Sequence, residues 1–428
     1  MSNTLFKKPA AVALYAAIAA FLTYMLIFGF RKSFTVCTFD GLRFWGLGYK
    51  TLLVIAQVLG YMAAKFYGIR FIAELKRIGR NKTILLLVGI AWLAWFLFAI
   101  TPAPYNIVFL FLNGFPLGML WGVVFSYVEG RKSTDFIGAA LAVSFIFSSG
   151  FVKTVGGWLL LYFSISEFWV PFCTGLVFAL PLLLFVWMME QIPAPSDADA
   201  AARMERVPMS SAERKALIRR FLPGIIAAVA IYLFATIFRD IRDNFSADMW
   251  KEMGYLNQPA IFTRTELPIT LAVLALIGSM VFLQNSYRAF LITHGIIALG
   301  FIIAGGSTWL FVHQQLSPIA WMTLVGLGLY MVYIPFNSIY FERMIAAFRF
   351  SGNVGFLIYV ADSFGYLGSV GVLLSKELFR VQLNWVNFFA QSVQILSIAG
   401  VVITLFATIY FVRKHDRESP APRLRGQS

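Results

Sequence analysis

The sequence predicts an all-α polytopic membrane protein with about twelve transmembrane helices, divided into two six-helix halves. Of its 428 residues, 60% are hydrophobic and only 13% are charged, and the mean hydropathy is +0.77. Apolar runs of about 18 residues or more recur along nearly the whole chain, and each is long enough to cross a bilayer core as a helix. A transmembrane barrel would require short alternating segments, and none stand out.

The expected spans form two sets of six, separated by a polar segment. They lie near 9–37, 51–69, 83–102, 106–128, 136–163 and 169–189, and near 221–245, 265–285, 288–312, 317–341, 353–375 and 386–412. The first apolar run follows two lysines, as the apolar core of a signal peptide does. The run is longer than such a core, so it is interpreted as a span.

The segment between the two sets combines Pro, Ala, Ser and charges of both signs, which is typical of a linker. We therefore expect an N-terminal half over 1–189, a cytoplasmic linker over 190–220, a C-terminal half over 221–413 and a basic cytoplasmic tail over 414–428.

The net charge of +15 follows the positive-inside rule and does not indicate nucleic-acid binding. With both termini cytoplasmic, most of the 35 Lys and Arg fall in cytoplasmic segments and few in outer loops. We expect a multi-pass monomer in the cytoplasmic (inner) membrane, with the lipid bilayer and a small anion as its partners.

The sequence indicates neither an enzyme nor a cofactor site. Only Cys37 and Cys173 occur, and the three histidines are scattered singly, so neither a disulfide framework nor a metal site is expected. No nucleophile–base–acid set or phosphate-cradling loop is present.

Six cations within or at the ends of spans are not explained by the topology rule. A charge inside an apolar span costs about 2.5–3.5 kcal/mol on insertion scales and marks a functional or paired group. The acids set against these cations are Asp240, Asp243 and Asp362, and the resulting surplus of positive charge favours an anionic substrate. The six cations are Arg31, Lys32, Lys65, Lys153, Arg239 and Arg242.

Two of these cations occupy matching places in the two halves. Tyr24 lies seven residues before Arg31, and Tyr232 lies seven residues before Arg239. Weaker similarities between the halves relate the position of Lys153 to that of Asp362, and the sequence around Glu129 to the sequence around Glu342. Together they predict two parallel six-helix halves, with a binding site built from both.

An arginine pair suits a phosphate or carboxylate, because the planar guanidinium makes paired hydrogen bonds and keeps its charge. Arg31 is a candidate ligand, although it can also cap its span at the outer surface. Arg239 belongs to an Arg-Asp-x-Arg-Asp cluster that can instead be an outer-end ion-pair network. We expect one of Arg239 and Arg242 to bind substrate while the other is paired.

The remaining candidates lie at different depths. Lys153 is too deep to reach water easily and is expected to face a cavity or an acid. Lys65 is closer to the cytoplasmic end, where snorkelling competes with a site role. Asp362 lies near the midplane and either pairs with a cation or carries a coupled proton. Tyr61 can line the cavity, and Glu129 and Glu342 are expected to form gate or loop contacts at the cytoplasmic ends of their spans.

Twelve spans, a central loop and parallel halves resemble the major facilitator superfamily. The basic segment 76–82 is similar to part of that superfamily's signature loop. This resemblance implies a fold of two six-helix bundles that alternate in access to the two sides of the membrane.

A narrower resemblance is to the organophosphate:phosphate antiporter family. Phe30-Arg31-Lys32-Ser33-Phe34 resembles its Arg-Lys-x-Phe element, and Gly60-Tyr61-x-x-x-Lys65-Phe66 resembles its second element, whose lysine faces the substrate. Lys153 replaces the histidine that the family places before Val-Gly-Gly, and Arg239 falls at its second phosphate-binding arginine. The chain also resembles, over its full length, a bacterial membrane family of unassigned function.

These features predict a secondary active transporter of a small organic anion, favouring an organophosphate, that works by phosphate exchange or proton coupling. The alternative is a membrane-embedded anion sensor that has a transporter fold but carries out no transport.

Overall fold

The computed structural model describes residues 9–75, 79–129, 131, 133–195, 199, 211–255, 257–280, 282–350, 354–378 and 384–418. Within them, twelve helices have 19 residues or more, as the sequence predicts. They are α1 (Pro9–Lys32), α2 (Tyr49–Leu75), α3 (Arg80–Ile100), α4 (Ile107–Phe125), α5 (Thr134–Tyr162), α6 (Val170–Glu190), α8 (Ser211–Glu252), α9 (Ala260–Met280), α10 (Ser286–Val312), α11 (Pro318–Ser338), α13 (Val354–Leu378) and α14 (Trp385–Glu418).

The apolar runs form helices because an α-helix satisfies its backbone hydrogen bonds internally, which a membrane interior requires. Among the described residues, ten helices are long and apolar enough to cross a membrane, and α2 and α13 complete the twelve. Large apolar side chains are exposed on the outer faces of the helices: Leu180 is 76% exposed and Ile398 is 70% exposed. Such faces suit contact with lipid, so the structure is that of a polytopic helical membrane protein.

Five helices depart from their expected bounds by five residues or more. Helix α1 ends at Lys32 rather than near 37, and α2 continues to Leu75 rather than ending near 69. Helix α8 begins at Ser211, inside the expected linker, and bends at Phe221, two residues before Pro223. Helix α9 begins at Ala260 rather than near 265, because its first turns pack against α5. Helix α14 continues to Glu418, beyond the expected start of the tail, and Glu418 pairs with Arg220 at 2.7 Å.

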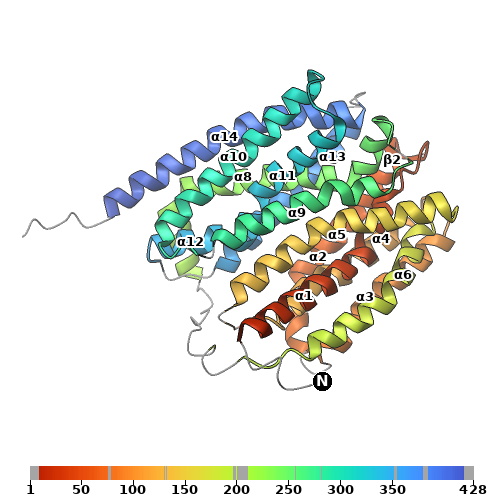
Figure 1. The fold of residues 1–428 in the computed structure, drawn as a ribbon, viewed down its shortest axis with the longest axis horizontal. Coiled ribbons are helices and arrows are strands. Elements are labelled where there is room, and N and C mark those ends of the chain that lie inside the picture. The colour runs from red at the N-terminus through yellow and green to blue at the C-terminus, as the bar shows by residue number, and fades with distance from the viewer. Residues whose placement is uncertain are drawn as a thin grey trace, which may run out of the picture.

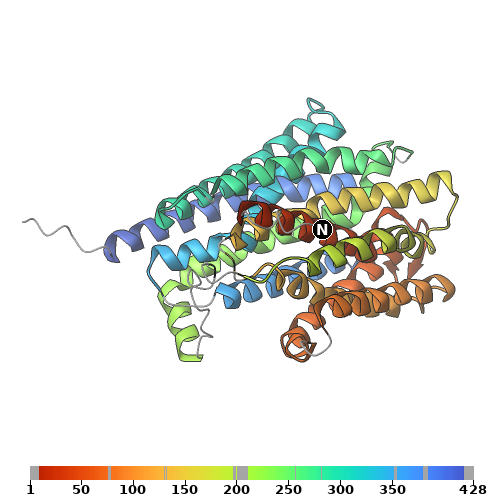
Figure 2. The ribbon, with the colours of Figure 1, turned by 60° about the horizontal axis from the view of Figure 1, so that its bottom comes forward.

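The helices run roughly side by side along the length of the molecule (Figures 1 and 2). Helices α1–α6 pack mainly on one another, as do α8–α14. The two bundles meet where α5 packs against α9 and α11, and α2 against α13. Because successive long helices alternate in direction, α1 begins and α14 ends at the same end of the bundle, which we call the termini end.

The opposite end carries a small hairpin and is called the hairpin end. After α1, a buried 3₁₀ turn, η2 (Ser33–Val36), leads to strands β1 (Arg43–Phe44) and β2 (Leu47–Gly48), which pair antiparallel. Between the strands, Trp45 and Gly46 both have positive φ, at 53° and 79°. Glycine tolerates this left-handed backbone without steric cost, so Gly46 allows the tight turn.

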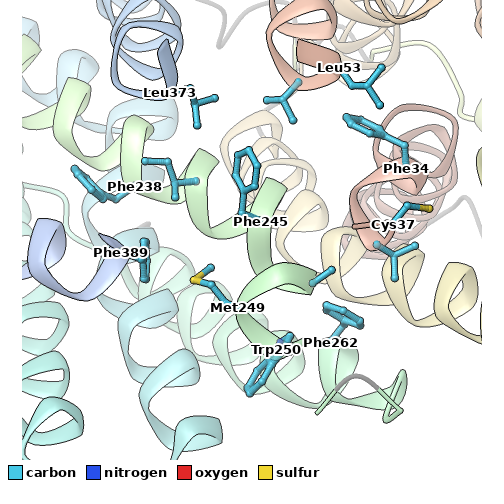
Figure 3. Close-up of a cluster of buried hydrophobic side chains, with 14 of the residues drawn as sticks. Phe34, Cys37, Leu53, Phe238, Phe245, Met249, Trp250, Phe262, Leu373 and Phe389 are labelled. Atoms are coloured by element: carbon cyan, nitrogen blue, oxygen red, sulfur yellow. The ribbon is translucent and has the colours of Figure 1, made fainter. Parts of the chain in front are cut away.

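A cluster of buried apolar side chains joins the two halves near the hairpin end (Figure 3). Phe34 and Leu53 come from the N-terminal half, and Phe245, Met249 and Phe262 from the C-terminal half. All five are less than 9% exposed. The contact between the bundles at this end is therefore largely apolar, and the charged groups described next lie within or beside it.

Candidate functional site

Asp243 on α8 is shared by two lysines of the N-terminal half. The Nζ atom of Lys153 on α5 lies 2.7 Å from Asp243 Oδ1 and donates to Ser149 Oγ at 2.8 Å. Lys32 Nζ donates to Asn244 Oδ1 at 2.6 Å and lies 3.9 Å from Asp243 Oδ2. The prediction that Lys153 faces an acid or a cavity is therefore resolved in favour of the acid.

Lys65 on α2 pairs with Asp362 on α13, rather than reaching toward the membrane surface. The other carboxylate oxygen of Asp362 accepts a hydrogen bond from Tyr232 Oη on α8. The Lys65 ammonium also lies 4.9 Å from the centre of the Tyr366 ring and 5.5 Å from that of Tyr61. This triad connects the two halves nearer the termini end than Asp243 does.

Arg31 lies inside the protein and does not cap α1 at the surface, since all four residues of the following turn η2 are buried. Its guanidinium carbon lies 3.8 Å from the centre of the Tyr61 ring. Among the described residues it takes part in none of the ion pairs, and its Nε atom has no hydrogen-bond partner.

Arg239 on α8 has a similar setting in the other half. Its guanidinium lies 4.0 Å from the centre of the Tyr333 ring and is bonded to Asp240 Oδ1 at 2.5 Å. Its Nε atom, like that of Arg31, has no partner among the described residues.

Arg242 is the paired member of the two C-terminal arginines. Its Nη1 atom lies 2.7 Å from Glu266 Oε1 on α9, and its Nη2 atom donates to the Met322 carbonyl at 2.9 Å. The close approach of Gly326 to the guanidinium leaves it little room to move. Of the two, Arg239 is therefore the one with donor capacity to spare.

Glu266 corrects the count of buried charges. It is 6% exposed, so it joins Asp240, Asp243 and Asp362 as an acid facing the buried cations. The positive surplus is smaller than the sequence indicated. Glu266 lies within the expected span 265–285, so the sequence alone could have placed it among the acids set against the six cations.

Aromatic side chains surround Arg31 and Lys65. Tyr24 is 6% exposed and packs edge-on against Trp121, with ring centres 5.2 Å apart. Tyr61 contacts Tyr366 across the two halves at 5.6 Å. The structure thus brings the predicted tyrosines of the N-terminal half to the same place as the cations.

The two glutamates expected at the cytoplasmic ends of their spans lie at the termini end, away from the central cations. Glu129 follows α4 and Glu342 belongs to the short helix α12 (Tyr340–Ala347), both at the termini end. The signature-like segment 76–82 lies partly outside the described residues; Arg80 within it stacks 4.0 Å from the Tyr127 ring centre. These groups are separate from the central cations.

One buried pair escaped the sequence prediction. Lys50 Nζ lies 2.6 Å from Asp248 Oδ2, with 5% and 14% of the two side chains exposed. Both residues fall just outside the expected spans, so their burial was not evident from hydropathy.

A family model described as "Family of unknown function (DUF5690)" matches residues 33–414. The chain belongs to this family. The predicted membership of a family of unassigned function is thereby confirmed. No curated protein matches the chain.

Solved structures of two transporters are similar in fold. A bacterial homologue of the human lysosomal transporter Spinster, in an inward-facing and unoccupied conformation, has 14% identity and a TM-score of 0.57, covering 97% of this chain and 100% of its own. The human organic anion transporter MFSD10 (TETRAN) has 14% identity and a TM-score of 0.53, covering 94% and 99%. The major facilitator fold predicted from the sequence is confirmed.

Proposed function

We propose that this protein is a secondary active transporter of a small organic anion, and that an organophosphate is the class of substrate that fits it best. The observation that carries the proposal is the arrangement of Arg31 and Arg239. They come from different halves, each stacks on a tyrosine, and each keeps an unbonded Nε atom.

An anion between the halves would complete this arrangement. A buried polar group without a hydrogen bond costs about 1–3 kcal/mol, and more when it is charged. A phosphate or carboxylate offers acceptor oxygens in the geometry that a guanidinium prefers. Binding would therefore remove a cost that the unbonded Nε atoms of the two arginines otherwise carry.

The contacts between the two halves allow the halves to move relative to each other. The two halves are joined by discrete contacts, of which the pair Lys65–Asp362 lies nearer the termini end and Lys50–Asp248 nearer the hairpin end. Breaking one set while keeping the other would open the site to one side at a time. The structural neighbours, one of them an organic anion transporter by name, support this reading.

Two modes of coupling are compatible with the site. In phosphate exchange, a second anion replaces the first at the same arginines. In proton coupling, Asp362 accepts the proton when Lys65 moves away. We place the protein in the cytoplasmic membrane as a monomer, with the termini end inside, because most cations outside the spans lie at that end.

The test combines binding and flux. A thermal-shift screen of the purified protein would compare inorganic phosphate, phosphate monoesters, phosphonates, sulfate and carboxylates. Uptake of the best of these into proteoliposomes is then measured for the wild type and for Arg31→Lys and Arg239→Lys. Lysine keeps the charge and loses the planar fork.

We expect both variants to abolish uptake while remaining folded, and Arg264→Lys, an exposed arginine at the hairpin end, to leave it unchanged. Wild-type rates in either central variant would refute the proposal. Binding without flux in the wild type would identify the protein as an anion sensor instead.

A further inference from the structure

A cavity of about 690 Å³ lies at the hairpin end, apart from the central arginines. Residues 38–43, 46 and 48–51 of the N-terminal half form one side, and residues of α8, α13 and α14 form the other. Its size falls within the range of roughly 300–1,000 Å³ that small-molecule sites occupy. Neither Arg31 nor Arg239 is among the residues that line it.

The carboxylates in and around this cavity are already bonded. Asp248 pairs with Lys50. Glu377 accepts hydrogen bonds from Thr51 Oγ1 at 3.0 Å and from the Gly48 amide at 3.3 Å, and it pairs with Arg43.

Two further acids nearby are satisfied as well. Glu252 accepts from the amides of Trp385 and Val386 at 2.9 and 2.8 Å, where the positive end of the α14 dipole also stabilises it. Asp40 pairs with Lys251.

Lys376 is the cation of this cavity that has no ion-pair partner among the described residues. It lines the cavity near the end of α13, and it takes part in none of the ion pairs among the described residues. Its ammonium lies 4.2 Å from the centre of the Trp385 ring and 5.6 Å from that of Phe388. A cation–π contact of this kind leaves the ammonium's other donors open.

The cavity also has an apolar wall. Phe245 and Trp385 stack with ring centres 3.7 Å apart, and Phe39 and Leu42 contribute from the hairpin side. An open ammonium beside aromatic surface suits a ligand that carries an anionic group and a flat apolar group together.

We propose that this cavity is a second anion-binding site, in which Lys376 binds the anionic group of a small organic anion and the aromatic wall contacts its apolar part. The site is distinct from the central arginines, and binding there does not require transport.

Hydrogen bonds connect the wall of this cavity to the charged groups between the halves. Lys50 lies at its inner side and donates to the Thr35 carbonyl at 3.0 Å, and Thr35 in turn bonds the Lys32 carbonyl at 2.6 Å. Lys32 then reaches Asn244 and Asp243 between the halves. These bonds join the wall of the cavity to the paired lysines between the halves.

The test uses a cysteine reporter in the purified full-length protein. Leu42→Cys lines the cavity, whereas Trp45→Cys lies on the hairpin outside it, where Trp45 is 75% exposed. Both are made in a Cys173→Ser background, since Cys37 is buried. The rate of labelling by a hydrophilic maleimide is measured with and without phenyl phosphate.

At four times its dissociation constant, phenyl phosphate is expected to slow labelling of Leu42→Cys about fivefold, because bound ligand blocks the reporter. Lys376→Gln should abolish this protection, and Arg264→Gln, which removes an exposed cation at the same end, should preserve it. Labelling of Trp45→Cys should be unaffected by the ligand.

The inference is wrong if phenyl phosphate gives no protection, if protection survives Lys376→Gln, or if Trp45→Cys is protected equally. Equal protection by phenol would show an apolar cavity without an anion site. Equal protection by inorganic phosphate would remove the apolar group from the proposed ligand. If phenyl phosphate slows the labelling of Leu42→Cys but no anion is taken up into proteoliposomes, the second site is supported and transport is refuted. If anions are taken up but labelling is not slowed, transport is supported and the second site is refuted.

Discussion

The two halves of the protein contribute opposite charges to the surface between them. In the buried pairs that join the halves, the cation comes from the N-terminal half and the acid from the C-terminal half: Lys32 and Lys153 with Asp243, Lys50 with Asp248, and Lys65 with Asp362. An exposed pair at the hairpin end, Lys251 with Asp40, has the reverse arrangement.

The two halves, despite their matching tyrosine–arginine positions, therefore carry different charges where they meet. The lysines counted from the sequence as an anion-attracting surplus are mostly bonded to acids of the other half. Asp240 pairs with Arg239, so the surplus that remains is Arg31, which takes part in none of the ion pairs among the described residues, and the second lysine that shares Asp243. The lysines therefore hold the halves together, whereas Arg31 and Arg239 keep Nε atoms without a partner among the described residues.

Asp243→Asn is expected to have the largest effect on stability. The change leaves Lys153 and Lys32, whose side chains are 3% and 6% exposed, without their shared carboxylate. Removing one partner of a buried ion pair costs about 3–5 kcal/mol. Thermal unfolding followed by size-exclusion chromatography would measure the loss, with the exposed Asp416→Asn as control. An unchanged melting temperature would show that these pairs do not hold the halves.

The pair Lys65–Asp362 is more exposed, at 21% and 11%, so each single change should cost less. We expect about 2–3 kcal/mol for Lys65→Met and for Asp362→Asn, below the full cost for a buried pair. The double variant should be no less stable than either single one, because it leaves no unpaired charge. A double-mutant cycle gives the coupling energy directly, and strictly additive effects would contradict the pairing.

Gly150→Ala tests the packing between the halves without changing a charge. A Cβ atom at Gly150 on α5 would lie 2.5 Å from the Phe262 carbonyl on α9 and close to Glu266. Such overpacking typically costs about 1–3 kcal/mol. Gly306→Ala is the matched control, since nothing lies within 4 Å of its added methyl group. Equal melting temperatures for the two variants would mean that α5 and α9 can separate freely.

The exposed pair Asp40–Lys251 should contribute least. With 63% and 38% of the two side chains exposed, Asp40→Asn is expected to cost under about 1 kcal/mol and to cost still less in high salt. The bond from Lys251 lowers the pKa of the Asp40 carboxyl.

The contribution of this pair is therefore present above the unfolded-state pKa, near about 3.9, and disappears as the pH falls through the lower folded value. Melting curves of the wild type and Asp40→Asn should converge at low pH, and a gap that widens there would contradict the assignment.

Much of the fold was predictable from hydropathy. The twelve spans were found because each apolar run is long enough to cross a bilayer. The ends of α8, α9 and α14 were not, since Ser211, Ala260 and Glu418 lie in polar or charged sequence that extends a helix beyond the apolar run. Hydropathy locates the part of a helix that lies in the membrane core, but it does not locate the residue at which the helix ends.

The candidate site was predictable only in part. Arg31, Lys153 and Arg239 stood out because a charge in an apolar run is costly wherever the helix packs. Lys50 and Asp248 did not, because residues near span ends are buried or exposed according to the neighbouring helix.

The sequence by itself therefore determined the number of spans, the division into halves and the identity of the charged groups inside them. These properties are local, since they depend on the cost of placing a residue in an apolar segment. Only the tertiary structure decided that Arg242 pairs with Glu266 while Arg239 keeps an unbonded Nε, and that one aspartate serves two lysines. Each step along a helix turns the side chain by about 100°, so the packing of α8 against both halves sets which charge meets which.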